Sequence, residues 1–435
     1  MSSQSLHQAK IGYLIPQFPG QTHIWMWREI IHLREWGLNI RIYSTRRPPD
    51  RDLARHGFAA AALQETTYLW PASIGALIAS VMWAVLTRPI RLLQCLGLAL
   101  TLPIEHQPGR HRHALPLVPL ACILARDAHR ERISHLHCHT CASGAVIAMM
   151  VKRLTGIPYS MTLNANLEVW AGAMQEKLSE AKFTVMITQW LLEQVRRDYP
   201  TLPADRAILG RIGVDTCKWV PKCRHLAREN VFRIASVSRL HASKGQDILL
   251  QAVAKVARTL AGISSESRLA VTIIGDGPER GSLESLTKEL RISDFVHFTG
   301  SLGEESVIEK LVDSDLFVLA SHSEPLGVAY MESMALELPT IGTNAGGVPE
   351  IIEDGVNGWL VPPRDPDALA DQIIWVMKHA ERRREVAIAG RKSIQARFDS
   401  RIGAATLHEQ FVGTMPELRG SGIRLAEADA HISNC

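Results

Sequence analysis

Short apolar runs alternate with amphipathic helical patterns along both halves of this 435-residue chain. Each run is continuously apolar, which is the pattern of strands in a parallel sheet that is covered on both faces. The pattern predicts strands at 10–15, 40–43, 133–137, 159–163, 183–187 and 207–212, and again at 232–237, 270–274, 295–298, 316–320 and 340–343. Helices are expected at 24–36, with Thr22 as N-cap, and at 142–154, 246–260, 280–290, 304–312 and 327–336. The expected fold class is α/β, with two doubly wound domains.

The composition is that of a globular protein, with 46% hydrophobic and 21% charged residues. The segment 215–229 lies between the two alternating patterns and is the expected linker. We therefore expect a first domain at 1–217 and a second at 218–396. A helix within 397–420 is expected to cross back onto the first domain, and 421–435 is expected to be a tail.

The formal net charge of +4 is unevenly distributed, because residues 1–220 carry +9 and residues 221–435 carry −5. A basic half indicates an anionic partner for that half alone. The seven cysteines are an odd number and cannot all pair in disulfides. The N-terminus lacks the apolar core of a signal peptide. These features predict a cytoplasmic location.

An apolar insertion at 66–125 interrupts the first domain. Residues 66–87 contain no charge, and two further apolar stretches at 92–104 and 114–125 follow the basic residues around Arg88 and Arg110. Apolar helices interleaved with basic residues are typical of segments that lie in a membrane interface. We therefore expect a membrane surface rather than nucleic acid as the partner of this half. The same pattern is also compatible with a buried helical core or a membrane span.

Two glutamates flank a glycine after the strand expected at 316–320. Glu324 lies in the loop, Gly327 and Val328 begin the next helix, and Glu332 lies about 7 Å along that helix. A helix N-terminus binds phosphate, and glycine allows a close approach to the backbone. With a carboxylate available for a polyol at each end, the motif predicts a nucleotide-sugar site; the alternative is two solvated glutamates.

Two cations follow the first strand of the same domain, Arg239 directly and Lys244 before the next helix. Their charges would neutralise a diphosphate leaving group without a metal. Gly277, in a tight turn, and Phe298, whose backbone could meet a base edge, follow the next two strands and border the same crevice. We include both in the expected donor site.

These residues carry a family resemblance. The stretches V-S-R-L-H-A-S-K-G-Q-D-I-L-L (237–250), I-I-G-D-G-P (273–278) and P-T-I-G-T-N-A-G-G-V-P-E-I-I-E-D-G-V-N-G-W-L-V-P-P (339–363), with the two glutamates, resemble glycosyltransferase family 4. Y-L-I-P-Q-F-P-G-Q-T-H-I (13–24), H-L-H-C-H-T-C-A (135–142) and I-G-V-D (212–215) are similar to its bacterial exopolysaccharide branch. The resemblance implies the GT-B fold, in which two Rossmann-like domains face each other across a cleft.

The resemblance also implies roles. Arg239 and Lys244 would bind the donor diphosphate together with the Gly327 and Val328 amides, Glu324 the transferred sugar, and Glu332 the ribose, while the loop at Gly20 would close over the donor. The implied reaction transfers a hexose from a UDP- or GDP-sugar, with retention and without a cofactor. The implied acceptor is a lipid-linked glycan or a polysaccharide of exopolysaccharide or cell-envelope synthesis, at the inner face of the plasma membrane.

One segment departs from the family pattern. T-L-N-A-N-L-E-V (162–169) stands where the family usually reads T-L-H-G-D-L-E-V, so Asn164 replaces a histidine that hydrogen-bonds the donor sugar. Asparagine still donates a hydrogen bond but does not titrate. The site is either adapted to another sugar or impaired, and a nucleotide-sugar-binding subunit without activity is the alternative function.

The run H-L-H-C-H-T-C places His135, His137 and His139 on one face of an expected strand and adds Cys138 and Cys141. These residue types are metal ligands, which raises a metal hydrolase as a further alternative. No second Cys/His pair elsewhere completes such a site. We therefore expect no metal, and we expect either packing or a role of His139 beside the substrates.

Overall fold

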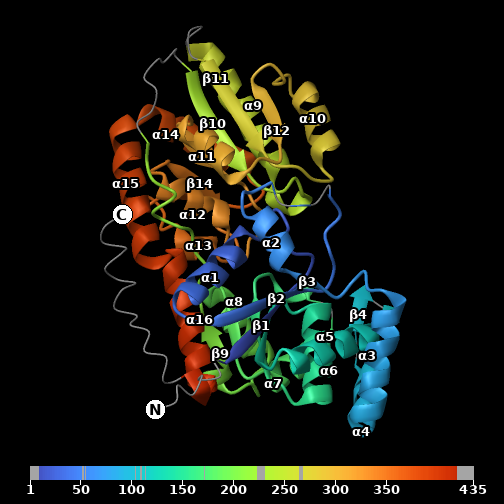
Figure 1. Cartoon of the computed structure of the whole chain (residues 1–435). Helices are drawn as coiled ribbons and strands as arrows, with labels where there is room; N and C mark the ends of the chain where they lie inside the picture. Colours follow the sequence, from blue (N-terminus) through green and yellow to red (C-terminus); the bar gives the residue numbers. More distant parts are fainter. Residues whose placement is uncertain are drawn as a thin grey trace. The chain divides into compact units, whose positions relative to one another are not determined.

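The computed structural model describes residues 9–50, 53, 55–102, 104–107, 110–112, 114–170, 172–222, 231–263 and 268–418. The chain forms two compact units (Figure 1). Of the described residues, unit 1 contains those up to 53, those within 58–211 and 403–418, and unit 2 contains 55–57 and those within 212–402.

Unit 1 is built on a parallel sheet of order β3-β2-β1-β6-β7-β8-β9. Its strands are β1 (Lys10–Ile15), β2 (Asn39–Ser44), β3 (Thr67–Tyr68), β6 (Ile133–His139), β7 (Tyr159–Leu163), β8 (Thr184–Met186) and β9 (Ala207–Leu209). Its helices are α1 (Ile24–Glu35), α2 (Ala59–Glu65), α3 (Ile74–Thr87), α4 (Pro89–Thr101), α5 (Val118–Arg130), α6 (Ser143–Thr155), α7 (Met174–Glu180) and α8 (Gln189–Asp198).

Two helix ends in unit 1 show how local sequence decides structure. The N-cap of α1 is His23 and not Thr22 as predicted. The His23 side chain does not cap the helix, and its Nδ1 accepts a hydrogen bond from the preceding Gly20 amide at 3.0 Å. Helix α6 ends at Gly156, whose φ of +85° is the left-handed conformation that glycine adopts without strain.

The insertion of unit 1 contains α3, α4 and α5. The antiparallel pair β4 (Ile104–Gln107) and β5 (Arg110–Arg112) lies between α4 and α5 in the sequence. Helix α5 packs into the core through Val118, Cys122 and Leu124, so the interfacial interpretation of 114–125 is wrong and its buried-core alternative holds. Among the described helices, no single one is long and apolar enough to cross a membrane. Helices α3 and α4 together have such length and composition, but they meet at a bend of 116°.

Unit 2 is built on a second parallel sheet, of order β12-β11-β10-β13-β14-β15. Its strands are β10 (Val231–Val237), β11 (Arg268–Ile274), β12 (Val296–Gly300), β13 (Leu316–Val318), β14 (Thr340–Thr343) and β15 (Trp359–Val361). Its helices are α9 (Gln246–Ile263), α10 (Arg280–Glu289), α11 (Glu304–Val312), α12 (Val328–Ala335), α13 (Val348–Ile351), α14 (Pro366–Lys378) and α15 (Ala380–Arg397).

The strand order of each sheet reverses beside its first strand, between β1 and β6 in unit 1 and between β10 and β13 in unit 2. This is the doubly wound arrangement, and the expected fold class is confirmed. In such sheets ligands bind at the carboxyl ends of the strands at the point of reversal. The two reversal points are therefore where a site is sought.

The last described helix, α16 (Ser400–Thr414), runs from unit 2 into unit 1. Its Phe411 is buried against Tyr13, His137 and Phe183 of unit 1. Nearby, Asp399 accepts a hydrogen bond of 2.5 Å from the Thr216 hydroxyl. Cys217 is disulfide-bonded, whereas Cys95, Cys122, Cys138 and Cys141 are free. The tail expected at 421–435 lies outside the described residues.

Candidate functional site

Two loops meet at the reversal point of the unit 2 sheet. One follows β10 and contains Arg239 and Lys244, and the other follows β13 and contains Glu324. The Lys244 Nζ lies 2.5 Å from Glu324 Oε2, and the main chains of the loops are joined by a hydrogen bond from the His322 amide to the Ser243 carbonyl. The structure thus brings together a cation and a carboxylate that are 80 residues apart in the sequence.

The Glu324 carboxylate is nearly buried, with 7% of its side chain exposed, while Lys244 is 23% exposed. A buried carboxylate requires partners, and Lys244 and the Ser321 hydroxyl, at 3.3 Å, supply them. The charged ends are therefore held in place, yet Lys244 remains within reach of a solvent-borne anion.

A glycine pair after β14 fixes the backbone of Glu324. The Gly347 amide donates a hydrogen bond of 2.9 Å to the Glu324 carbonyl. Gly346 has a φ of +59°, and a Cβ there would lie 2.1 Å from the same carbonyl oxygen. Only glycine permits this approach. Gly346 and Gly347 were not predicted as residues that support the site, although the A-G-G run at 345–347 was a visible signal for them.

Helix α12 begins beside the same carboxylate. Its N-cap is Gly327, with a φ of +95°, and a Cβ there would meet the Tyr330 ring at 2.4 Å and Glu324 Cγ at 3.1 Å. Val328 is the first helical residue, and Glu332 follows one turn later on the same helix. The amides of a first helical turn have no acceptor within the helix, so this end of α12 is suited to an anion.

Arg239 lies exposed in the loop after β10, as expected for a ligand-binding cation. The turn after β11 packs directly under this loop, since a Cβ at Gly277 would lie 2.2 Å from the Leu240 carbonyl oxygen. Leu240 in turn donates its amide to Asp276 at 3.0 Å. The structure accounts for Gly277 by this close packing, which positions the Arg239 loop. The Phe298 side chain packs against the core of unit 2, and a role of its backbone stays a prediction.

The reversal point of unit 1 carries the other predicted residues. Gly20 lies in the loop after β1, His139 ends β6, and Asn164 follows the neighbouring β7. All three therefore belong to the carboxyl edge of one sheet. Gly20 contacts His23, whose pKa is lowered to about 4, first by burial and then by the charge of His139.

The three histidines of β6 lie on one face of the strand, as their alternation predicts. His137 stacks edge-on against His139, with ring centroids 4.9 Å apart, and both contact the Tyr13 ring. His135 and His137 share the Ser160 hydroxyl of β7, at 2.7 and 2.8 Å. Burial lowers the pKa of His135 to about 3 and that of His137 well below its usual value. These two rings are neutral packing elements under α16.

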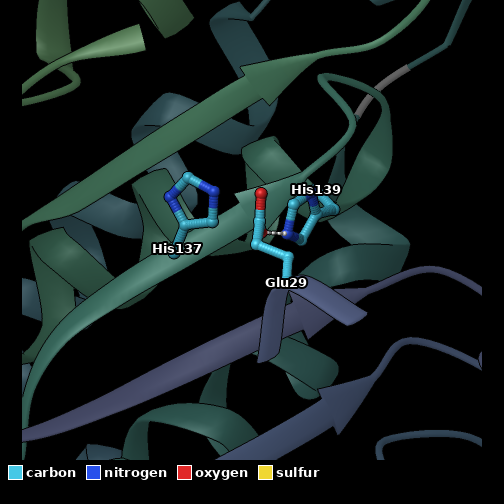
Figure 2. Close-up of side chains that lie close together, drawn as sticks. All are labelled: Glu29, His137 and His139. Carbon is cyan, nitrogen blue, oxygen red and sulfur yellow. Dashed lines mark ion pairs between the residues drawn. The ribbon is translucent and has the colours of Figure 1, made fainter. Parts of the chain in front are cut away.

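His139 differs because it faces a carboxylate. Its Nε2 lies 2.8 Å from Glu29 Oε1 of α1 (Figure 2). The Tyr13 hydroxyl donates to the same oxygen at 3.2 Å. The His139 side chain is fully buried, and Trp25 packs edge-on against it. The buried His139 side chain therefore contacts the residues around it and is shielded from solvent. Glu29 was not singled out from the sequence, because it lies 110 residues from His139 in an ordinary helical pattern.

The metal set suggested by the histidine-cysteine run does not form. Cys138 and Cys141 lie apart from the imidazoles, Cys138 against the Gly144 carbonyl and Cys141 against Met161. Among the described residues, Glu29, His137 and His139 offer ligand atoms within 4.8 Å of one another. Both ring nitrogens of His137, however, are hydrogen-bonded, to Ser160 and to Thr162. His137 is thus committed to hydrogen bonds within the sheet, and His139 pairs with Glu29.

Thr140 directly follows this cluster in a strained conformation. Its φ is +90°, which is rare for a β-branched residue. Its buried hydroxyl has no hydrogen-bond partner among the described residues, although its amide donates to the Thr162 carbonyl at 3.1 Å. Strain of this kind persists only where the surroundings enforce it, and it concentrates at functional sites.

The comparisons with known proteins decide the family. The family model described as glycosyl transferases group 1 matches residues 222–393, which contain the Lys244–Glu324 pair and the N-terminus of α12. Residues 222–393 therefore form a group 1 glycosyl transferase domain. This confirms the resemblance drawn from the motifs, and the chain is accordingly a glycosyltransferase of the GT-B fold class.

Two curated relatives and one solved structure illustrate the relationship. This glycosyltransferase is 37% identical over 148 residues to N-acetyl-alpha-D-glucosaminyl L-malate synthase of Bacillus anthracis, covering 34% of this chain and 38% of the relative. It is 28% identical over 280 residues to the amylovoran biosynthesis glycosyltransferase AmsK of Erwinia amylovora, covering 55% and 67%.

The solved structure is that of Anabaena HepE in complex with UDP and glucose. It superposes with a TM-score of 0.68 at 18% identity and covers 93% of this chain and 99% of that one. At this identity the likeness concerns the fold. The aligned part spans little more than a third of the Bacillus relative, so the activity of that whole protein is not transferred to this glycosyltransferase.

Proposed function

We propose that this glycosyltransferase transfers a hexose from a UDP- or GDP-sugar, with retention, to a lipid-linked or polysaccharide acceptor in exopolysaccharide synthesis. The observation that carries the proposal is the Lys244–Glu324 pair at the reversal point of the unit 2 sheet, next to the Gly327 end of α12. This arrangement offers a cation, a helix N-terminus and a carboxylate at one edge of the sheet.

The three groups match the parts of a nucleotide sugar. Lys244, the exposed Arg239 and the first amides of α12 would bind the diphosphate, and their charges would stabilise it as it leaves. Glu324 would accept hydrogen bonds from the hexose, and Glu332 would take the ribose. Lys244 is paired with Glu324, so a bound diphosphate would compete with this carboxylate for the ammonium group.

Retention in this proposal requires no strong base from the protein. The bond from the anomeric carbon to the nucleotide oxygen breaks first, and the acceptor hydroxyl then attacks from the same face. Its proton passes to the departing phosphate. Asn164 would donate a hydrogen bond to the hexose, and His139, held by Glu29, would position the loop around Thr140.

Two relatives support the choice of substrates without deciding it. HepE was solved with UDP and glucose, and AmsK is named for amylovoran biosynthesis. A polysaccharide assembled on a lipid carrier would place the acceptor at the inner face of the plasma membrane. The proposed location is therefore cytoplasmic and peripheral to that membrane.

The donor is identified by measuring the melting temperature with a panel of UDP- and GDP-sugars. A specific donor raises the melting temperature by mass action, because binding at a hundredfold excess over the dissociation constant adds about 2.7 kcal/mol to the free energy of unfolding. Glu324→Gln should abolish hexose transfer to membrane extract and retain nucleotide binding, whereas Glu385→Gln, on an exposed helix surface, should change neither.

The rival function is a nucleotide-sugar-binding subunit without activity, suggested by the uncharged Asn164. It predicts donor-dependent stabilisation with no release of nucleotide under any acceptor. Nucleotide release that depends on acceptor and is lost in Glu324→Gln would exclude it. No stabilisation by any nucleotide sugar would refute both functions.

A further inference from the structure

Helices α3 and α4 expose an unusual amount of apolar side-chain surface. Most large hydrophobic residues that the described structure leaves exposed belong to this one segment of unit 1. Ile74, Leu86 and Ile90 are each more than 70% exposed. The apolar face, as we call this set, consists of Trp70, Ile74, Ile78, Met82, Val85, Leu86, Ile90, Leu93 and Leu100.

The spacing of these residues puts them on the outer sides of both helices. In α3, Ile74, Ile78, Met82 and Val85 recur every three or four residues, which is one side of a helix. The opposite side packs through Ala84 and Ser80 toward α5, and Trp83 contacts His129 of that helix. Figure 1 shows α3 and α4 in light blue beside α5 and α6. The two helices are therefore anchored on the core by one side and apolar on the other.

Helix α4 repeats the arrangement. Leu92, Cys95 and Ala99 are buried in the core of unit 1, whereas Ile90 and Leu93 point away from it. An apolar surface of this extent is uncommon on a monomeric protein and marks a surface that contacts a partner or a membrane.

The charges of the segment favour a membrane with anionic lipids. Residues 66–104 contain no aspartate or glutamate, and their only charged residues are Arg88 and Arg91. Arg88 is the residue at which α3 ends and α4 begins. Cations beside an apolar helical face are attracted to anionic headgroups, at roughly 1 kcal/mol for each cation near the surface.

The exposed hydroxyl groups of the helices are also satisfied within the helices. Thr87 Oγ1 donates to the Trp83 carbonyl at 2.7 Å, and Thr101 Oγ1 donates to the Gly97 carbonyl at 3.0 Å. Ser73, the N-cap of α3, accepts from the Ala76 amide at 3.2 Å. Polar groups that bond internally lose little when water is replaced by hydrocarbon.

The bend of 116° between α3 and α4 excludes their use as one continuous span, and neither helix is long enough alone. We propose that α3 and α4 insert side-on into the headgroup and upper acyl region of one anionic leaflet, as a monotopic anchor. The inference deepens the proposed function, on which it rests for the acceptor's location, by naming the surface that holds the enzyme at the lipid-linked substrate.

The first experiment uses the full-length wild-type protein and no sugar donor. The protein is floated with vesicles of phosphatidylcholine alone and with anionic vesicles that contain 30% phosphatidylglycerol. We expect co-flotation with the anionic vesicles, weakened by salt because exposed charges are screened. Absence of flotation with both compositions would overturn the anchor.

The second experiment separates the apolar face from the cations. Leu86→Glu/Leu93→Glu should reduce binding to anionic vesicles at least tenfold, since both side chains are about 70% exposed and would enter the leaflet. Arg88→Gln/Arg91→Gln should reduce binding roughly thirtyfold on anionic vesicles only, since it removes two cations. The matched control is Val356→Glu, an equally drastic change at a 49% exposed valine of unit 2, which should leave binding unchanged.

The remaining occupant to test is a second copy of the chain. Light scattering in detergent-free buffer should show no discrete dimer of the wild type. A dimer held by the apolar face would be dissociated by Leu86→Glu/Leu93→Glu. Such a dimer, together with no vesicle binding, would assign the apolar face to self-association instead. Melting temperatures establish that each variant is folded. Because donor stabilisation is measured separately, a wild-type protein that is stabilised by its donor but binds neither kind of vesicle would refute the anchor and leave the proposed transferase intact.

Discussion

The glycine beneath Glu324 provides the sharpest test of the donor site. Gly346→Ala would place a Cβ 2.1 Å from the Glu324 carbonyl oxygen. Close carbon–oxygen contacts in proteins lie at about 3.3–3.6 Å, so the backbone of one loop would have to move by about 1 Å. That movement would also break the hydrogen bond from Gly347 and displace the carboxylate from Lys244.

Gly355→Ala is the matched control, because Gly355 has a φ of +70°, close to the +59° of Gly346, and its Cβ would meet nothing within 4 Å. Both variants carry the left-handed strain of an alanine, roughly 1–2 kcal/mol. In a unit of this size that strain lowers the melting temperature by about 2–8 °C. Only Gly346→Ala adds the steric conflict.

The assay is nucleotide release with the donor found in the thermal-shift panel, together with the melting temperature. Gly346→Ala should melt lower than Gly355→Ala and should lose about a hundredfold in turnover, the effect of misplacing a reacting group by about 1 Å. Equal turnover in the two variants would refute the idea that the glycine pair positions Glu324.

Three further predictions concern stability. The pKa values of His135 and His137 are lowered in the folded protein, so below about pH 6.5 these two imidazoles bind protons in the unfolded chain but stay neutral in the folded one. The free energy of unfolding should therefore fall on acidification, by up to ~1.4 kcal/mol per pH unit for each imidazole. His135→Asn should flatten this fall in melting temperature between pH 7 and 5, and an unchanged slope would contradict the assignment. A double-mutant cycle of Lys244→Met and Glu324→Gln should give a coupling of ~1–2 kcal/mol in unfolding, less than for fully buried pairs because Lys244 is 23% exposed, and zero coupling would show that the pair is not formed in solution. Thr140→Gly should stabilise unit 1 by ~1 kcal/mol by releasing the φ of +90°, and a lower melting temperature would show that the strain is absent.

Local patterns predicted the parts of the fold that short-range physics determines. The apolar run of β1 and the charged N-terminus of α11 gave element bounds that match the structure, at Lys10–Ile15 and Glu304–Val312. The three arginines at 382–384 indicated a solvated helix face, but the bounds of α15 (Ala380–Arg397) were not predicted, because charged residues occupy most of its sides. Helix α5 was misjudged because apolarity alone does not distinguish a core helix from an interfacial one.

The same distinction applies to the candidate site. Lys244, Glu324 and Gly327 could be found from the sequence, because the ends of parallel strands meet at one edge and these residues directly follow strands. The residues that hold them in place could not be found in this way. Ser321, Gly346 and Glu29 act through contacts that depend on how loops and helices pack in three dimensions.

The passage of α16 into unit 1 has a consequence for synthesis on the ribosome. Phe411 covers His135 and His137, so the sheet built mainly from the first 211 residues stays uncovered on that side until almost the whole chain has emerged. Unit 2 is made nearly entirely of one continuous stretch, residues 212–402. The half that is translated second can thus complete its fold before the half that is translated first, which must wait in a partly open state for its last helix.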